Sequence, residues 1–140
     1  MCGYATQANR KVQRKCISEI NDATILDRKW RIVWQIVNQG AENQNLTGAE
    51  LSFAHLRLGR LRSANLARAN LSGADLAGAD LVGARLIEAD LSGANFEGAN
   101  LRGAVLNRAN LRGANLTSAI TANANFCGAI MPDGVKFVCP

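Results

Sequence analysis

The feature that most limits how this chain can fold is a five-residue repeat, which runs from residue 44 to residue 133. Eighteen units follow one another without a break in register. If the positions of a unit are numbered as slots one to five, slot three is leucine in fourteen units and slot one is alanine in sixteen. Slot two is usually asparagine or aspartate. Self-similarity of this kind indicates a repeat architecture before any single residue is interpreted.

A period of five fits neither regular secondary structure. On an α-helix, five residues advance about 500°, so successive leucines would be spread around the axis. On a flat strand the side chains alternate between faces, so an odd period would place successive leucines on opposite sides. The chain must therefore turn once in every unit. We expect a solenoid with a leucine and alanine interior, in which each buried leucine stabilises the fold by about 1.5–3 kcal/mol.

A second period, of twenty residues, is superimposed on the first. Slot five holds Arg68, Glu88 and Arg108 at intervals of twenty, and the six slots five between them are all glycine. We therefore expect four units per coil, a square cross-section and about 4.5 coils. Glycine suits the third position of a type II turn, where φ is positive, whereas the charged column should adopt an ordinary φ. The three charged residues should form a ladder between neighbouring coils.

The tandem motif Ala-Asn/Asp-Leu-x-x resembles the pentapeptide repeat family, and the resemblance covers about two-thirds of the chain. The resemblance implies a mainly β fold, the right-handed quadrilateral β-helix, with the central Leu or Phe and the preceding Ala inside. It implies little about function, because most members of this family, which is abundant in cyanobacteria, have no assigned activity. We expect the outward slots two, four and five to tolerate almost any residue.

The segment before the repeats, residues 1–43, has a different pattern. Residues 25–39 are predicted to form an amphipathic α-helix that ends before Gly40. Because an open solenoid end exposes apolar side chains and unpaired strand groups, we predict that this helix caps the first coil. A weaker apolar stripe in residues 8–20 is expected to pack on its second face. The expected cap residues are Leu26, Trp30, Val33, Trp34 and Val37, with the tryptophans in the cap core rather than in a ligand cage.

At the other end, the sequence MPDGV predicts a turn that ends the repeats, 44–133, and leaves a tail, residues 134–140. Apolar residues gather near this end, and two interpretations are open. They form a dimer contact, as exposed apolar patches often do, or the tail folds back over them; we favour the second. The candidate dimer contact consists of Val105, Ile120, Ile130, Phe137 and Val138.

Composition argues against several classes of function. No apolar run approaches 18 residues and no apolar stretch follows the basic start, so we expect neither a membrane span nor a secretory signal, and a cytoplasmic location. The four cysteines include no Cys-x-x-Cys pair and His55 is the one histidine, so no metal or cofactor is expected. We expect reduced cysteines; a disulfide between Cys127 and Cys139 is the alternative, which a cytoplasmic location disfavours.

The net charge of +5 comes mostly from outside the repeats, which carry eight basic and seven acidic residues. With four units per coil, two adjacent sides meet at an edge that holds most of the arginines. We call this set the arginine edge and treat it as the candidate interaction surface. It consists of Arg60, Arg62, Arg68, Arg85, Arg102 and Arg108.

Three functions compete. The first is a non-enzymatic scaffold for protein–protein interaction, which fits a rigid rod with a polarised surface and no catalytic constellation. The second is nucleic-acid binding by the arginine edge, against which stand the absence of stacking aromatics and the small number of cations. The third, gyrase binding by DNA mimicry, is suggested by the family resemblance but requires an acidic rod. We favour the scaffold, with a protein partner and no enzymatic activity, as a monomer or a homodimer through the C-terminal end.

Overall fold

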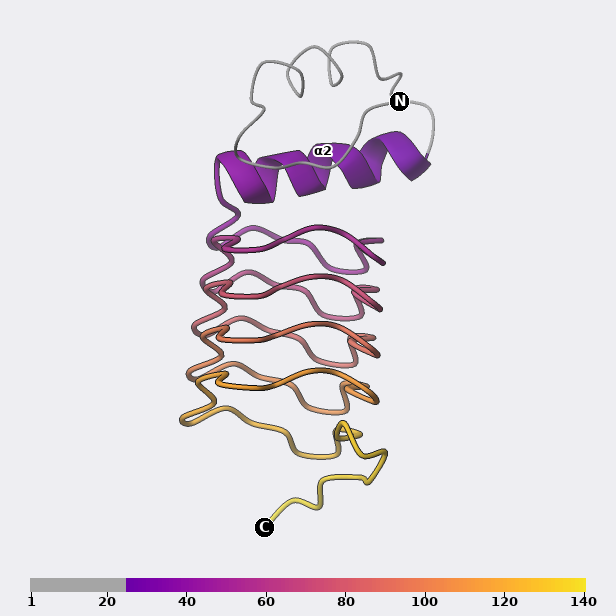
Figure 1. Cartoon of the computed structure of the whole chain (residues 1–140), viewed down its shortest axis with the longest axis vertical. Coiled ribbons are helices and arrows are strands. Elements are labelled where there is room, and N and C mark those ends of the chain that lie inside the picture. The colour runs from indigo at the N-terminus through magenta and orange to yellow at the C-terminus, as the bar shows by residue number, and fades with distance from the viewer. Residues whose placement is uncertain (1–24) are drawn as a thin grey trace.

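The computed structural model describes residues 25–140, with side chains described from Arg28 onward. Helix α2, Ile25–Asn38, lies across one end of a stack of coils (Figure 1) and is one residue shorter than the predicted range of 25–39. Within residues 25–140 the coils contain no strand longer than a single bridge residue. The predicted stripe in residues 8–20 lies outside the described residues.

Each coil contains twenty residues, as the second period of the sequence predicts. Slot-two residues twenty apart are bridged in parallel, beginning with Asn45 and Asn65. Three backbone hydrogen bonds per unit connect neighbouring coils; the N–H of Leu66, for example, donates to the C=O of Arg85 at 2.7 Å. Four units therefore complete one coil, and the solenoid has four sides.

Slots one and three fill the interior of the solenoid. Every slot-three side chain from Leu51 to Leu111 is completely buried, including Phe96, and the slot-one alanines lie beside them. Toward the C-terminal end the slot-three residues become partly exposed, as at Leu116 and Met131, because no further coil covers them. The core is thus a column of leucines that is closed along its length and open at its C-terminal end.

Every corner of the coil uses the same left-handed backbone conformation. The φ angle is positive at each slot five from Gly48 to Gly128, including Arg68 at 59°, Glu88 at 57° and Arg108 at 59°. In each unit, the N–H of the following slot one donates to the C=O of slot three, which makes slot five the third residue of a type II-like turn. The prediction that the charged column adopts an ordinary φ is wrong, because one turn geometry closes all four sides.

Helix α2 contributes to the core through Val33 and Ile36. These side chains are 0% and 1% exposed and belong to the same buried cluster as the first coils. Of the expected cap residues, Trp30 and Val37 pack partly buried against this cluster. Trp34 is also partly buried. The side chain of the fifth expected residue, Leu26, lies outside the described part.

Gly59 interrupts the slot-one alanines where α2 contacts the coil. A Cβ on Gly59 would lie 3.0 Å from Cγ2 of Ile36 and 2.9 Å from the carbonyl oxygen of Leu56. Both distances are shorter than ordinary van der Waals contacts. The missing methyl group therefore gives the helix room to approach, which explains a departure that the repeat pattern alone leaves unexplained.

Candidate interaction surface

Slot two is a structural position rather than a free surface position. Wherever it is asparagine or aspartate, and also at Glu50, its side-chain oxygen accepts a hydrogen bond from the slot-four N–H at 2.9–3.2 Å. This is the Asx-turn interaction that favours Asn and Asp in turns. The amides also connect coils, as Asn115 donates to Asn95 at 3.0 Å. The turn therefore favours Asn and Asp at slot two, although the bridges between coils continue where slot two holds other residue types.

Six units hold another residue type at slot two, and in five of them the side chain has no hydrogen-bond acceptor. After one of the five, Ile130, slot four is Pro132, which has no N–H to satisfy. In the other four units the turn lacks the hydrogen bond that is made in the units with Asn, Asp or Glu50 at slot two. The five residues are Arg60, Arg85, Val105, Ile120 and Ile130.

Arg68, Glu88 and Arg108 form the predicted charge ladder at one corner of the coil. Nε of Arg68 donates to Oε2 of Glu88 at 2.9 Å, and Nη1 of Arg108 lies 3.5 Å from Oε1. The hydrogen bond from Arg68 and the charge of its guanidinium hold the pKa of Glu88 below its ordinary value, and Arg108 lowers it further. Because all three side chains are exposed, salt screens this ladder.

Two more arginines of the edge are also paired with carboxylates. Nη1 of Arg62 lies 3.4 Å from Asp80, and Nε of Arg60 lies 3.4 Å from Glu42. Arg60 also donates to the C=O of Gln39 at the end of α2. With the ladder, four of the six arginines of the edge face a carboxylate, so much of their charge is locally balanced.

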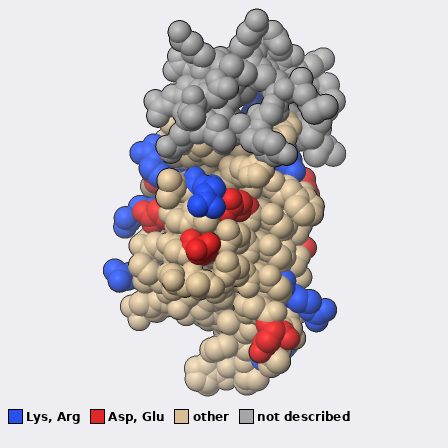
Figure 2. Space-filling view, viewed as in Figure 1, with Lys and Arg blue, Asp and Glu red and all other residues tan. Residues whose placement is uncertain are grey.

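Arg85 and Arg102 differ from the other arginines of the edge. Both are exposed, and within residues 25–140 neither forms an ion pair. Arg85 occupies slot two on one side, and Arg102 occupies slot four on the side before it. Figure 2 shows basic and acidic side chains interspersed on the visible face rather than merged into one basic strip. The unbalanced charge of the edge is therefore concentrated in these two residues.

Two exposed apolar residues at the corners were not predicted from the sequence. Phe53 and Leu58 occupy slot five with φ of 55° and 57°, and they are 74% and 63% exposed. A Cβ on Gly73 would lie 2.5 Å from the Phe53 ring, and one on Gly78 would lie 2.7 Å from Leu58. Each large side chain thus lies over the glycine one coil further on. The sequence pattern that could have predicted this packing is a large apolar residue at slot five with a glycine twenty positions later.

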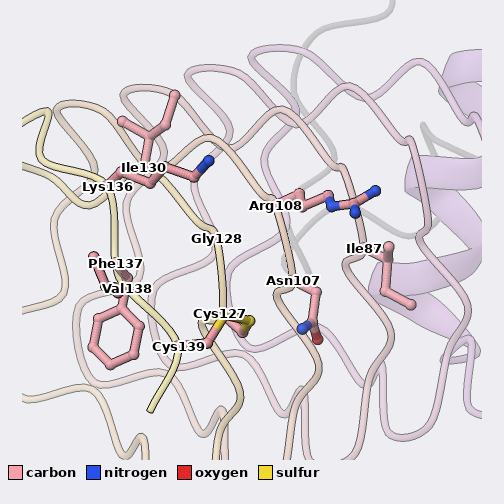
Figure 3. Close-up of a pocket in the computed structure, with 10 residues that line it drawn as sticks. All are labelled: Ile87, Asn107, Arg108, Cys127, Gly128, Ile130, Lys136, Phe137, Val138 and Cys139. Carbon is pink, nitrogen blue, oxygen red and sulfur yellow. A yellow bond between two sulfur atoms is a disulfide. The ribbon is translucent and has the colours of Figure 1, made fainter.

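The five residues of the candidate dimer contact do not form one patch. Ile130, Phe137 and Val138 line a hollow of about 930 Å³ at the C-terminal end (Figure 3). Val105 and Ile120 are not among its lining residues. Ile120 lies two units before Ile130, which places it on the opposite side of a four-sided coil.

The tail folds back on the last unit, but it does not cover the apolar residues of this end: Ile120 is 44% exposed, and Phe137 and Val138 of the tail itself are 42% and 82% exposed. Ile130 pairs antiparallel with Lys136, and this pairing brings Cys139 opposite Cys127. The two cysteines form a disulfide, with their Cα atoms 4.8 Å apart. The expectation of reduced cysteines is wrong for this pair, because the turn of the tail creates a proximity that spacing along the chain does not reveal.

The part of the chain from residue 25 onward has no group of His, Cys, Asp or Glu side chains that would hold a metal ion. No helix in that part is long and apolar enough to cross a membrane.

The chain is similar to several solved structures of pentapeptide repeat proteins. It is similar to HetL, a pentapeptide repeat protein involved in heterocyst differentiation regulation from the cyanobacterium Nostoc sp. strain PCC 7120, with 44% identity and a TM-score of 0.52 over 70% of this chain and 43% of HetL. A pentapeptide repeat protein of the cyanobacterium Cyanothece 51142 shares 40% identity, with a TM-score of 0.46, over 60% of this chain and 54% of its own. No curated protein sequence matched.

A third similar structure is a pentapeptide repeat protein of the Arabidopsis thaliana thylakoid lumen, with 36% identity and a TM-score of 0.48 over 64% of this chain and 61% of its own. The chain thus spans less than two-thirds of each of these relatives, and less than half of HetL. The family model for pentapeptide repeats matches residues 64–103 and 94–132, in eight copies. Together with the similarity to HetL and the twenty-residue coil, this match shows that the chain belongs to the pentapeptide repeat family.

Proposed function

We propose that the chain is a non-enzymatic scaffold that binds a protein partner through the faces of its solenoid. The observation that carries this proposal is Arg85. It stands at slot two, where most units use Asn or Asp to close the turn, and it is exposed without an ion pair in the described chain. A charged residue that replaces the usual turn-closing side chain and forms no internal ion pair is best explained by a contact outside the molecule.

The surface around Arg85 fits an acidic patch on a partner protein. Arg102 provides a second unbalanced cation on the neighbouring side. The paired arginines Arg62 and Arg108 lie at the borders, where their charges are partly neutralised. Complementary charge of this kind steers association and selects among partners more than it adds affinity.

Nucleic-acid binding by the arginine edge is the alternative function, and the ion pairs weaken its support. Binding that follows a phosphate backbone rests on many unpaired cations, whereas four of the six arginines already face carboxylates. Phe126 is the one aromatic residue on the two sides of the repeat that hold Arg85 and Arg102, and it occupies an inward slot three packed against the core rather than an outward slot available for base stacking. A gyrase-binding DNA mimic requires a strongly acidic rod, which this repeat is not.

The proposed function is tested by affinity capture, in which the wild type and variants of the chain are used as bait in extracts of the native host. The most informative variant is one that strengthens the turn while it removes the exposed charge. Arg85→Asn supplies the missing turn oxygen and removes the charge, so it should keep the fold and lose the partner. Charge reversal of Arg62, Arg85 and Arg102 should also lose it. Arg112→Asn removes an exposed arginine on another side and should retain the partner. An unchanged set of captured proteins with all variants would contradict the proposal.

The nucleic-acid alternative has its own assay, a salt titration of binding to random-sequence DNA. The scaffold proposal expects no retention of DNA even at low salt. Binding whose affinity falls steeply with salt and disappears in Arg85→Asn would replace the proposed function with the alternative. HetL is involved in regulating heterocyst differentiation, and a regulatory role of that kind is compatible with a partner-binding scaffold.

We also propose the finer description of the fold: a right-handed coil, α2 as its N-terminal cap, and segments 1–43, 44–133 and 134–140. The burial of Val33 and Ile36 supports the cap. A cytoplasmic location is proposed as well, in which the Cys127–Cys139 pair would meet cellular thiols.

The oligomeric state is proposed to be a monomer or a homodimer formed through the C-terminal end. The dimer is supported by the backbone N–H groups of Leu116, Thr121 and Phe126, which have no backbone partner within residues 25–140. Ile120, 44% exposed, lies beside Thr121 on this open edge. Light scattering across a concentration series measures the state, and Ile120→Lys should abolish a dimer that uses this edge.

A further inference from the structure

The Cys127–Cys139 pair lies where the tail leaves the solenoid. After a turn at Gly134, where φ is +85°, the tail runs antiparallel to the last units, with Ile130 bridged to Lys136. The two cysteines are each three residues from that bridge, on opposite strands, so they face each other directly. Their sulfur atoms are bonded. The bond therefore fastens the end of the tail to the body of the solenoid.

Few other contacts hold the tail in place. The N–H of Phe137 donates to the C=O of Ala129 at 2.7 Å, and its C=O accepts from Gly128 at 2.9 Å. Its ring contacts that of Phe126, with centroids 6.2 Å apart. Val138 is 82% exposed, so burial of apolar surface does little to retain the tail. A segment held this lightly depends on its covalent link.

The tail takes the place of a further coil. In the body of the solenoid, slots three and five donate their N–H groups to the next coil. At the C-terminal end the N–H of Met131 donates instead to the C=O of Val135 at 2.8 Å, and that of Gly128 donates to Phe137. Release of the tail would leave both N–H groups without a partner. The disulfide therefore determines how much unpaired backbone this end presents.

The bond is accessible to a reductant. Both cysteines line the hollow of about 930 Å³ shown in Figure 3. Cys139 is exposed and Cys127 is partly buried, so an incoming thiolate reaches the sulfur of Cys139 first. Arg108 and Lys136 line the same hollow, and nearby positive charge favours the thiolate form of the cysteine that leaves.

We propose that Cys127 and Cys139 form a reversible redox site, which a dithiol reductant opens to release residues 134–140 from the end of the solenoid. The first thiolate of the reductant attacks Cys139, forming a mixed disulfide and releasing Cys127, which takes up a proton. The second thiol attacks the mixed disulfide and frees Cys139 as a thiol. Two electrons and two protons pass to the protein, and the dithiol becomes a disulfide.

The test uses the full chain with Cys2→Ser and Cys16→Ser, so that only this pair is counted. The folded protein is equilibrated in buffers with different ratios of reduced to oxidised dithiothreitol. Free thiols are then alkylated, and the number of labels is counted by mass spectrometry. Hydrogen exchange of the backbone amides is measured on the same samples. We expect two labels after reduction without unfolding. Exchange at Gly128, Met131 and Phe137 should accelerate by on the order of 10- to 100-fold, as loss of a loop-closing disulfide implies.

Two controls separate release of the tail from general loosening. The amides of Leu86 and Leu106, in the body of the solenoid, should keep their protection in both redox states. The variant Cys139→Ser should show the fast exchange without any reductant. The proposal is overturned if Cys127 and Cys139 take no alkyl label until the protein unfolds, or if both stay labelled after equilibration in oxidising buffer. It is also overturned if the exchange rates of the Gly128 and Met131 amides are the same in both redox states. None of these outcomes bears on Arg85.

Discussion

The aromatic ring of Phe53 lies over Gly73, so close that a Cβ added to Gly73 would stand 2.5 Å from the ring. The two residues occupy the same corner in successive coils. Gly93 follows in the same column, and nothing lies within 4 Å of the position where its Cβ would be. Both glycines have a positive φ, of 64° and 65°. The two positions therefore share the same backbone conformation and differ only in whether a side chain lies over them.

Gly73→Ala should therefore destabilise the protein more than Gly93→Ala. Both substitutions place a Cβ in the left-handed region, at about 1–2 kcal/mol each. Gly73→Ala adds steric overlap with the ring, which we expect to raise the loss by about 1–3 kcal/mol. Denaturant unfolding of the two variants measures the difference. In a Phe53→Ser background the two substitutions should cost the same; a difference that persists there would show that the ring is not its source.

Val105→Asn should stabilise the fold by about 0.5–1.5 kcal/mol, the net worth of one hydrogen bond. The new side-chain oxygen would accept the N–H of Asn107, as Asn100 accepts that of Arg102 at 3.2 Å. Ile130→Asn is the matched control, because the residue two positions on is Pro132, which has no N–H. Chemical unfolding should show a gain for Val105→Asn alone. Equal effects of the two substitutions would contradict the role that we assign to slot two.

Glu88→Lys should lower the melting temperature more than Glu97→Lys. Glu88 faces Arg68 and Arg108 in adjacent coils, whereas Glu97 forms no ion pair among the residues from 25 onward. Lysine at position 88 would set three positive charges in one column. The gap between the two variants should narrow in high salt, because these side chains are exposed. Thermal unfolding of both variants at low and high salt measures this difference. Equal melting temperatures for the two variants at low salt would show that the charge ladder does not stabilise the fold.

The ladder also predicts a pH dependence. The pKa of Glu88 is lowered in the folded state, first by the hydrogen bond from Arg68 and then by its charge. A carboxyl with a depressed folded pKa contributes stability above its unfolded pKa, which is about 4.3 for glutamate. That contribution disappears as pH falls through the lower, folded value. Wild type should therefore exceed Glu88→Gln in stability at neutral pH, and melting curves of the two should converge below about pH 4.

Helix α2 and the coil should be energetically coupled at one contact. Ile36→Ala removes a fully buried side chain and should destabilise the fold by about 2–4 kcal/mol. Gly59→Ala should destabilise the wild type, because its methyl group would meet Ile36 at 3.0 Å. In the Ile36→Ala background the same substitution should cost less, giving a favourable coupling in a double-mutant cycle. Strict additivity would show that the backbone of Leu56, rather than the helix, excludes the methyl group.

The coil and its ladder could be predicted because they are written into the periodicity of the chain. A period of five forces one corner per unit, and Arg68, Glu88 and Arg108 mark every fourth corner. Their φ could not be predicted, because a charged residue in the left-handed region contradicts its local preference. Closure of the coil imposes that conformation at all four corners alike, so the tertiary structure overrides the preference.

The candidate surface was only partly predictable. The sequence places six arginines on two sides, but the carboxylates that neutralise four of them become neighbours only when coils stack. Arg85 stands out only once the turn bond made by Asn and Asp is known. The Cys127–Cys139 bond depends on the reversal at Gly134, and a turn signal alone does not say where the tail goes afterwards.

The stacking rule also limits how the length of this protein can change. The N–H groups that connect neighbouring coils are each matched to a carbonyl 19 or 21 residues away, as Leu66 is to Arg85 and Arg85 is to Ala64. Insertion or loss of twenty residues within the repeats would preserve every alignment along the rod. Insertion or loss of five would also preserve the core, but it would rotate everything downstream by a quarter turn. A change of five residues upstream would therefore leave a stable protein in which Arg85 and Cys127 lie on different sides relative to the N-terminal end. A change in the number of repeats can thus alter which surfaces are presented together without unfolding the protein.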